Sequence, residues 1–158
     1  MQKLYKRVGG RILYHEAWAN DDVVTEHWGL VGEQGDTREH RVESSHDAST
    51  AISSVLVTAR DNGYEEVDLD DHDIMAVEFD VDGFGTPHDL EKRHRLEDRM
   101  NETLGWTGLG HCDGGSIGSG TMEVACFVVD YETARCVVEN DFEGTEFANY
   151  TRIYNERA

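Results

Sequence analysis

The chain has few of the residues that cross-link or interrupt a polypeptide. Its 158 residues include three cysteines and one proline, and an odd number of widely spaced cysteines predicts neither a disulfide framework nor a zinc site. Free cysteines favour a reducing cytoplasm as the location. The chain also lacks an apolar run of about 18 residues, so we expect no membrane-spanning helix. Residues 1–8 lack the apolar stretch of a signal peptide.

Cationic residues are also scarce. The chain has 14 lysines and arginines against 33 aspartates and glutamates, a formal net charge of −19. Residues 1–72 hold 7 cationic and 15 acidic residues, a net of −8, and residues 73–158 hold the remaining −11. This charge is a poor match for bare nucleic acid or an anionic membrane. It suits a basic protein partner, and equally a salt-adapted source in which most proteins are acidic.

The first half of the sequence predicts an antiparallel meander followed by a helix. Alternating residues between glycine- and aspartate-rich turns indicate strands over residues 4–8, 11–19, 23–31 and 37–44. Gly9-Gly10 is a two-residue hairpin signal, because a type I′ turn needs positive φ at both central residues. We expect the helix over residues 46–62, with Ser45 as N-cap and Gly63 after its end. Its apolar stripe is Ala48, Ala51, Ile52, Val55, Leu56 and Ala59.

A short motif lies at the end of the third expected strand. It consists of Trp28-Gly29, then Gly32, Gly35 and Thr37, with Asn62-Gly63-Tyr64 closing the helix. With these residues, segment 14–64 resembles a WGR domain, which is found in eukaryotic poly(ADP-ribose) polymerases and in bacterial proteins. In the polymerases, the Trp and Arg of the W-G-R motif help to bind DNA ends and to relay damage to catalysis.

The resemblance implies a nucleic-acid or partner contact at Trp28, Gly29 and Leu30, with Arg38 and Arg41 as neighbouring cations. Leu30 stands where the Arg of the motif belongs, and Leu cannot supply the phosphate contact of an Arg. DNA binding is therefore disfavoured. It would need a basic patch beside Trp28, drawn from Lys3, Lys6, Arg7, Arg11, Arg38 and Arg41. The alternative is that Trp28 is a partly buried sheet residue.

The second half predicts a β-α-β-β-α-β unit. Strands are expected over residues 74–81, 106–112, 121–129 and 147–154. One helix starts at Thr86-Pro87 and runs to about Leu104, with Leu90, Leu96, Met100 and Leu104 inward, and Asp130 caps the other. This order is the ferredoxin-like pattern, an antiparallel sheet with two helices on one face. The fold class is thus α+β, with a WGR-like domain over 1–67, an acidic connector, and a ferredoxin-like domain over 73–158.

The most unusual stretch of the second half is rich in glycine. Four glycines fall within residues 114–120, and we expect a loop whose backbone N–H groups could bind an anion or touch a partner. The candidate residues are Asp113, Gly114, Gly115, Ser116, Gly118 and Ser119. The alternative is a flexible or bulged hairpin, since a phosphate-binding loop joins a strand to a helix and this one joins two strands.

Other chemistry has little support in the sequence. His111 and Cys112 are adjacent on a strand and point to opposite faces, so we expect no metal site. Cys126 and Cys136 fit small buried apolar residues. Glu123, Ala125 and Phe127 are expected on the helix-free face of the sheet, but the basic and aromatic signature of RNA-stacking modules is missing. No cofactor motif is present.

These features favour a non-enzymatic bacterial binding protein that acts through a protein partner of basic charge. A toxin-neutralising role is one specific form, because the second half weakly resembles small bacterial immunity-type proteins. The alternative is a regulatory module that binds nucleic-acid ends, as the WGR resemblance implies. An enzyme would need a constellation of catalytic side chains that the sequence does not suggest.

Overall fold

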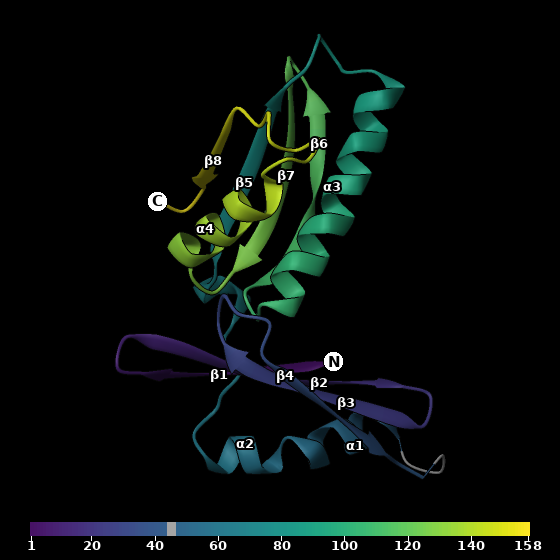
Figure 1. The fold of residues 1–158 in the computed structure, drawn as a ribbon, viewed down its shortest axis with the longest axis vertical. Helices are drawn as coiled ribbons and strands as arrows, with labels where there is room; N and C mark the ends of the chain where they lie inside the picture. Colours follow the sequence, from purple (N-terminus) through teal and green to yellow (C-terminus); the bar gives the residue numbers. More distant parts are fainter. Residues whose placement is uncertain (44–46) are drawn as a thin grey trace. The chain divides into compact units, whose positions relative to one another are not determined.

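The computed structural model describes residues 1–43 and 47–158, which form two compact units (Figure 1). The first unit spans residues 1–68 and the second spans residues 69–158. Each unit contains one four-stranded antiparallel sheet with helices, so the predicted α+β class is confirmed.

The sheet of the first unit is a meander with strand order β1-β2-β3-β4. Its strands are β1 (Gln2–Val8), β2 (Arg11–Asn20), β3 (Val23–Leu30) and β4 (Asp36–Arg41). Gly9 and Gly10 both have positive φ, 56° and 79°, as the predicted type I′ turn requires. β4 ends at Arg41, before the predicted end, and Ser44 lies outside the described residues.

The helical segment of this unit is divided in two, whereas one helix was predicted. α1 (Ala48–Val55) and α2 (Val57–Asp61) meet at Leu56. Serines and β-branched residues occupy every position from 52 to 58 except Leu56, and they are weak helix formers, which fits an interruption here. The predicted N-cap Ser45 lies outside the described residues.

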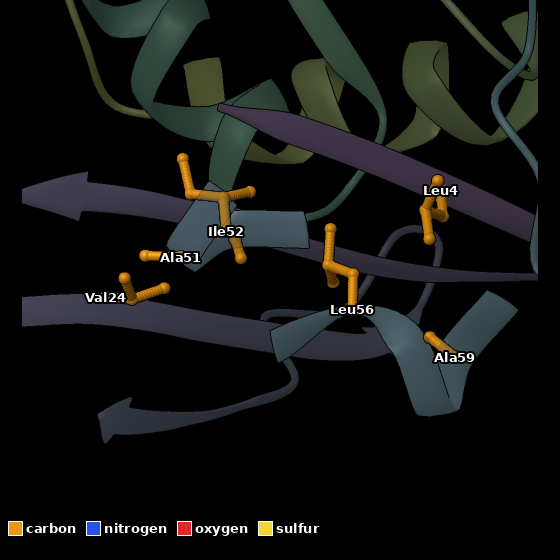
Figure 2. Close-up of a cluster of buried hydrophobic side chains, with 7 residues drawn as sticks. Leu4, Val24, Ala51, Ile52, Leu56 and Ala59 are labelled. Atoms are coloured by element: carbon orange, nitrogen blue, oxygen red, sulfur yellow. The ribbon is translucent and has the colours of Figure 1, made fainter. Parts of the chain in front are cut away.

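The predicted apolar stripe nevertheless forms the core of the first unit. Ala51, Ile52, Leu56 and Ala59 are all buried and pack on Leu4, Ala17 and Val24 of the sheet (Figure 2). The remaining stripe residues lie nearer the surface, since Val55 is partly buried and Ala48 is exposed. Gly63, with a φ of 87°, follows α2 as predicted.

The second unit has the strand order β6-β7-β5-β8, with every neighbouring pair antiparallel. Its strands are β5 (Asp73–Asp80), β6 (Gly110–Gly118), β7 (Thr121–Val128) and β8 (Arg152–Asn155). α3 (Pro87–Trp106) connects β5 to β6, and α4 (Tyr131–Phe142) connects β7 to β8. A short 3₁₀ helix, η1 (Leu69–Asp71), lies within the predicted connector.

The helix starts of the second unit are those predicted. Thr86 and Asp89 form a reciprocal capping box at α3, and the Asp130 carboxylate accepts from the Thr133 amide at α4. α3 runs on through Gly105 to Trp106. Leu90 was predicted to face inward, but it is 42 % exposed and only the later apolar residues of α3 are buried.

One face of the second sheet carries the core. Its buried side chains alternate along the two central strands, and they are Met75, Val77, Phe79, Met122, Val124, Cys126 and Val128. Lys92 of α3 lies with its ammonium 4.4 Å from the centre of the Phe79 ring, which places α3 on this face. Figure 1 shows α3 and α4 running alongside the same sheet.

The predicted strand over 106–112 and the predicted loop over 113–120 are both wrong. β6 occupies Gly110–Gly118, and only Ser119 and Gly120, with φ of 54° and 88°, form the turn to β7. Two glycines of β6, Gly110 and Gly115, allow close approach of the β7 backbone. A Cβ at Gly110 would lie 1.9 Å from the Phe127 carbonyl oxygen, and one at Gly115 would lie 2.4 Å from that of Glu123.

Candidate binding surfaces

Trp28 is a half-buried residue of β3, on the same sheet face as Val24 of the core. The His15 ring of β2 stacks on it with centroids 5.8 Å apart and an interplanar angle of 27°. The Arg38 guanidinium of β4 lies 5.4 Å from the centre of the Trp28 ring. Trp28 is therefore already in contact with an aromatic and a cationic neighbour of its own sheet.

Glu26 joins two histidines beside this tryptophan. Its two carboxylate oxygens each lie 2.7 Å from a ring nitrogen, one from Nε2 of His15 and the other from Nε2 of His40. Burial by itself would raise the pKa of Glu26, but the hydrogen bonds from His40 and His15 outweigh it, and the pKa is lowered. We call His15, Glu26, Trp28, Arg38 and His40 the Trp28 cluster.

Arg38, Lys6 and Arg11 share the sheet face of Trp28, whereas the other three candidate cations lie on the opposite face. Of the six candidate cations, Arg38 contacts the ring, while Lys3 pairs with Glu16 at 3.1 Å on the opposite face of the sheet. Lys6 donates to the Asn62 carbonyl at 2.6 Å. Arg7 shares the face of Lys3, and Arg41, three residues after Arg38, faces away from Trp28. Arg11 lies opposite Val8 at the hairpin end of β1 and β2.

The glycines of the W-G motif have an architectural role. A Cβ at Gly35, where φ is 67°, would lie 2.1 Å from the Trp28 carbonyl oxygen and 2.5 Å from the Tyr14 hydroxyl. A Cβ at Gly29 would lie 2.8 Å from Cα of Gly35. The turn after β3 thus folds directly onto that strand, and both glycines allow the approach. Leu30 is half-buried and pairs with Leu13 of β2.

A buried polar network fastens the same turn. The Tyr14 hydroxyl lies 2.9 Å from the Glu33 carbonyl oxygen and 2.8 Å from that of Gln34. Nε2 of His27 lies 3.0 Å from the Tyr14 hydroxyl and within hydrogen-bond distance of the Gln34 carbonyl. Burial, followed by the charge of Glu16, raises the pKa of Tyr14.

The network continues to a buried carboxylate. Nδ1 of His27 lies 2.7 Å from Glu16, and both side chains are almost wholly buried, at 0 % and 2 % exposure. Nζ of Lys3 lies 3.1 Å from the other carboxylate oxygen of Glu16. The network is sealed from solvent and serves stability.

The sequence interpretation missed these partners of Trp28 and Tyr14, although a signal was present. β2 and β3 pair around the turn at Asp21-Asp22, which sets His15 opposite Trp28 and Glu16 opposite His27. Counting outward from that turn gives both pairs. The residues that β4 and the turn after β3 bring to these sites could be found only in the folded structure, because the conformation of that turn depends on Gly35.

The helix-free face of the second sheet carries a second cluster. Glu78 of β5 and Glu123 of β7 are direct cross-strand neighbours. Arg152 of β8 binds Glu78 through two hydrogen bonds of 3.1 and 3.0 Å, and its guanidinium lies 4.1 Å from the centre of the Tyr154 ring. Tyr154 in turn donates to Glu123, and this bond to the carboxylate, with burial, raises the pKa of Tyr154 to about 12.

Apolar side chains border this acidic row. Phe127 lies 5.7 Å from the His111 ring, measured between centroids, and pairs across the strands with Ile74. Ile74, Ala125 and Phe127 are half-buried. We define the open face as these residues together with Glu78, Glu123, Arg152 and Tyr154.

The candidate residues of the glycine-rich stretch take other positions than predicted. All but Ser119 lie on β6, in register with β7 except at the irregularity between Cys112 and Gly114. Gly115 lies under α3, where Arg93 donates to its carbonyl oxygen at 3.0 Å, and Ser116 is opposite Glu123. Asp113 lies at the irregularity, Gly118 pairs with Thr121, and Ser119 belongs to the turn. The stretch is therefore not a loop but part of a bulged hairpin, which was the alternative interpretation.

Within residues 1–43 and 47–158, no helix is long and apolar enough to cross a membrane, and no three potential ligands gather around a metal position. Cys126 is buried as predicted, whereas Cys136 is exposed. Comparison of the chain with protein-family models, with curated proteins and with solved structures finds no match.

Proposed function

We propose that the chain is a non-enzymatic binding protein that takes a basic protein partner on the open face. The proposal takes the first unit as a WGR-like module and the second as a ferredoxin-like module. The strand order of the second unit and its β-α-β-β-α-β succession support the latter. Neutralisation of a basic toxin is one form that such binding would take.

The observation that carries the proposal is that most cationic side chains already contact groups of their own chain. Within the described residues, seven lysines and arginines form ion pairs inside their own unit. Lys6 and Arg157 donate to backbone carbonyls, and Arg38 lies on Trp28. With 33 carboxylates in the chain, a cationic partner finds many acceptors, whereas a polyanion finds few available cations.

The open face is the best candidate contact surface because its charges are imperfectly balanced. Two carboxylates directly opposite each other repel, and the one cation of this face, Arg152, forms its ion pair with Glu78. Arg152 is 57 % exposed, so an incoming guanidinium can join or replace it. The neighbouring Phe127 and Ile74 add apolar contact area, which an ion pair alone lacks.

The DNA-end alternative retains one favourable contact, Arg38 on Trp28. Leu30 in the position of the motif's Arg and the dispersal of the other cations weigh against it. A blunt-ended DNA duplex is thus the natural competitor in a binding test.

The test uses an arginine-rich peptide as probe and two double variants of equal charge. Glu78→Gln with Glu123→Gln alters the open face, while Glu91→Gln with Glu102→Gln alters exposed positions of α3. We expect about tenfold weaker peptide binding for the first pair and less than about twofold for the second, by calorimetry at low salt. Equal losses would show that only diffuse charge matters, and tight duplex binding would favour the DNA alternative.

A further inference from the structure

Two of the three cysteines are direct partners across adjacent strands. Cys112 of β6 lies opposite Cys126 of β7. The Cys112 amide donates at 2.8 Å to Oδ1 of Asn101 on α3, and so points away from β7. The two cysteines therefore occupy a non-hydrogen-bonded pair, in which Cα atoms are about 4.5 Å apart. A disulfide needs a separation of about 4.4–6.8 Å.

The two thiols differ in access. Cys126 is fully buried among the core residues of β7, whereas Cys112 is half-buried. A hydrogen bond between the thiols lowers the pKa of Cys112 and, with burial, raises the pKa of Cys126. Burial of Cys112, and after it the negative charges of Glu97 and Asp113, oppose this lowering of its pKa without cancelling it. Cys112 is thus both the more accessible thiol and the more readily ionised one.

We propose that Cys112 and Cys126 are a redox-active pair, which a peroxide converts into a cross-strand disulfide. The pair is independent of the open face, because both side chains lie on the helix-covered face of the sheet with Val124 and Val128. The proposal therefore does not depend on partner binding.

The chemistry takes two steps. The Cys112 thiolate attacks a peroxide oxygen, the S–O bond forms as the O–O bond breaks, and the departing oxygen takes up a proton as water. Cys112 is thereby oxidised to a sulfenic acid by two electrons, and the peroxide is reduced. The Cys126 sulfur then attacks the Cys112 sulfur, and the S–S bond forms as the S–O bond breaks. The hydroxyl leaves with the Cys126 proton as a second water.

The disulfide would close the irregular part of the hairpin. Between Cys112 and Gly114 the register of β6 on β7 shifts, and Asp113 is the extra residue. A bond at this position ties edge strand β6 to the neighbouring strand β7. Reduction by a dithiol returns the two cysteines to the form in this structure.

The sequence allows a direct measurement. Cleavage after Arg99, Arg135 and Arg152 places Cys112 and Cys126 in one peptide, 100–135, and Cys136 in the next, 136–152. After treatment of the folded chain with hydrogen peroxide, we expect peptide 100–135 to lose the mass of two hydrogens and to resist iodoacetamide. Reduction with dithiothreitol should restore both properties, while peptide 136–152 stays alkylatable throughout.

Three variants separate the proposal from general oxidation. Cys136→Ser should behave as the parent chain, and Cys112→Ser should abolish the mass loss. Alanine suits the buried apolar site of Cys126. In Cys126→Ala, Cys112 should therefore remain as a sulfenic acid that dimedone captures. Over-oxidation of Cys112 in the parent chain, or a disulfide through Cys136 instead, would overturn the proposal.

Discussion

At the scale of single residues, Gly35 has no room for a side chain. Its φ of 67° and the 2.1 Å from its Cβ position to the Trp28 carbonyl oxygen both require glycine. We expect Gly35→Ala to lower the free energy of unfolding by about 2–4 kcal/mol, the sum of left-handed strain and overpacking. Urea unfolding followed by tryptophan fluorescence would measure it, since Trp18 and Trp28 lie in the first unit.

Gly9→Ala is the matched control for this substitution. Gly9 also has a positive φ, 56°, but a Cβ there would meet no atom of the described residues within 4 Å. The loss should therefore be about 1 kcal/mol, from backbone strain alone. If both substitutions cost the same, the close packing of the turn onto β3 contributes nothing.

Residue identity alone revealed the W-G motif but not what surrounds it. Trp28 and Gly29 were recognisable because the motif is local, and the half-buried position of Trp28 was one of the alternatives considered. Glu26, His15 and His40 come from three strands, and their meeting depends on register. The pattern within one strand could not show that Glu26 binds both histidines, because the register between strands decides which residues are neighbours.

At the scale of elements, α3 and α4 are joined by a charged contact. Arg99 of α3 donates two hydrogen bonds, of 2.8 and 2.7 Å, to the Asp141 carboxylate of α4, and Thr103 adds a third. The hydrogen bonds from Arg99 lower the pKa of Asp141. Arg99 is 42 % exposed, so solvent screening limits the contribution of the pair to about 1 kcal/mol or less.

We expect Asp141→Asn to lose this contribution at neutral pH and to lose nothing in acid. Because the folded-state pKa is below the unfolded one, the stabilisation is complete above the unfolded pKa of about 3.9 and disappears as pH falls through the folded value. Urea unfolding of both chains between about pH 3 and pH 7 should show their free energies converging at the acidic end. Asp98→Asn, an equal charge change at an exposed position of α3, should show no such convergence, and a convergence there would implicate net charge instead.

Elements with local signals were predictable, and elements set by packing were not. The capping box at Thr86 and the cap at Asp130 depend on residues within one turn, and both were identified in advance. β6 was read as a loop because its glycines are local loop signals. Glycine is required at Gly110 and Gly115 by the close approach of β7, and at Gly115 also by α3, which a local sequence pattern does not show. The break at Leu56 was hidden by a stripe that continues through it.

At the scale of the whole molecule, the net charge of −19 bears on stability as well as on partners. Both units share the excess, so repulsion acts within each of them. Salt screens this repulsion, which stabilises the folded state, and also screens the surface ion pairs, which destabilises it. Carboxylates outnumber cations by 33 to 14, and most of the ion pairs are exposed and individually weak, so relief of repulsion should dominate.

We therefore expect the melting temperature of the chain to rise as KCl increases from about 0.05 M to about 1 M, where the screening length falls from above 10 Å to about 3 Å. Choline chloride, which screens without a small cation, is the control. An equal rise of the melting temperature in both salts would assign the effect to screening.

If the chain is already folded in low salt and its melting temperature rises only modestly, the acidic surface fits a basic partner, because the partner can supply the missing cations on binding. A chain that is unfolded until salt approaches molar concentration would instead assign the acidity to a salt-adapted source. A melting temperature that falls with salt would contradict the argument, because the ion pairs would then outweigh the repulsion.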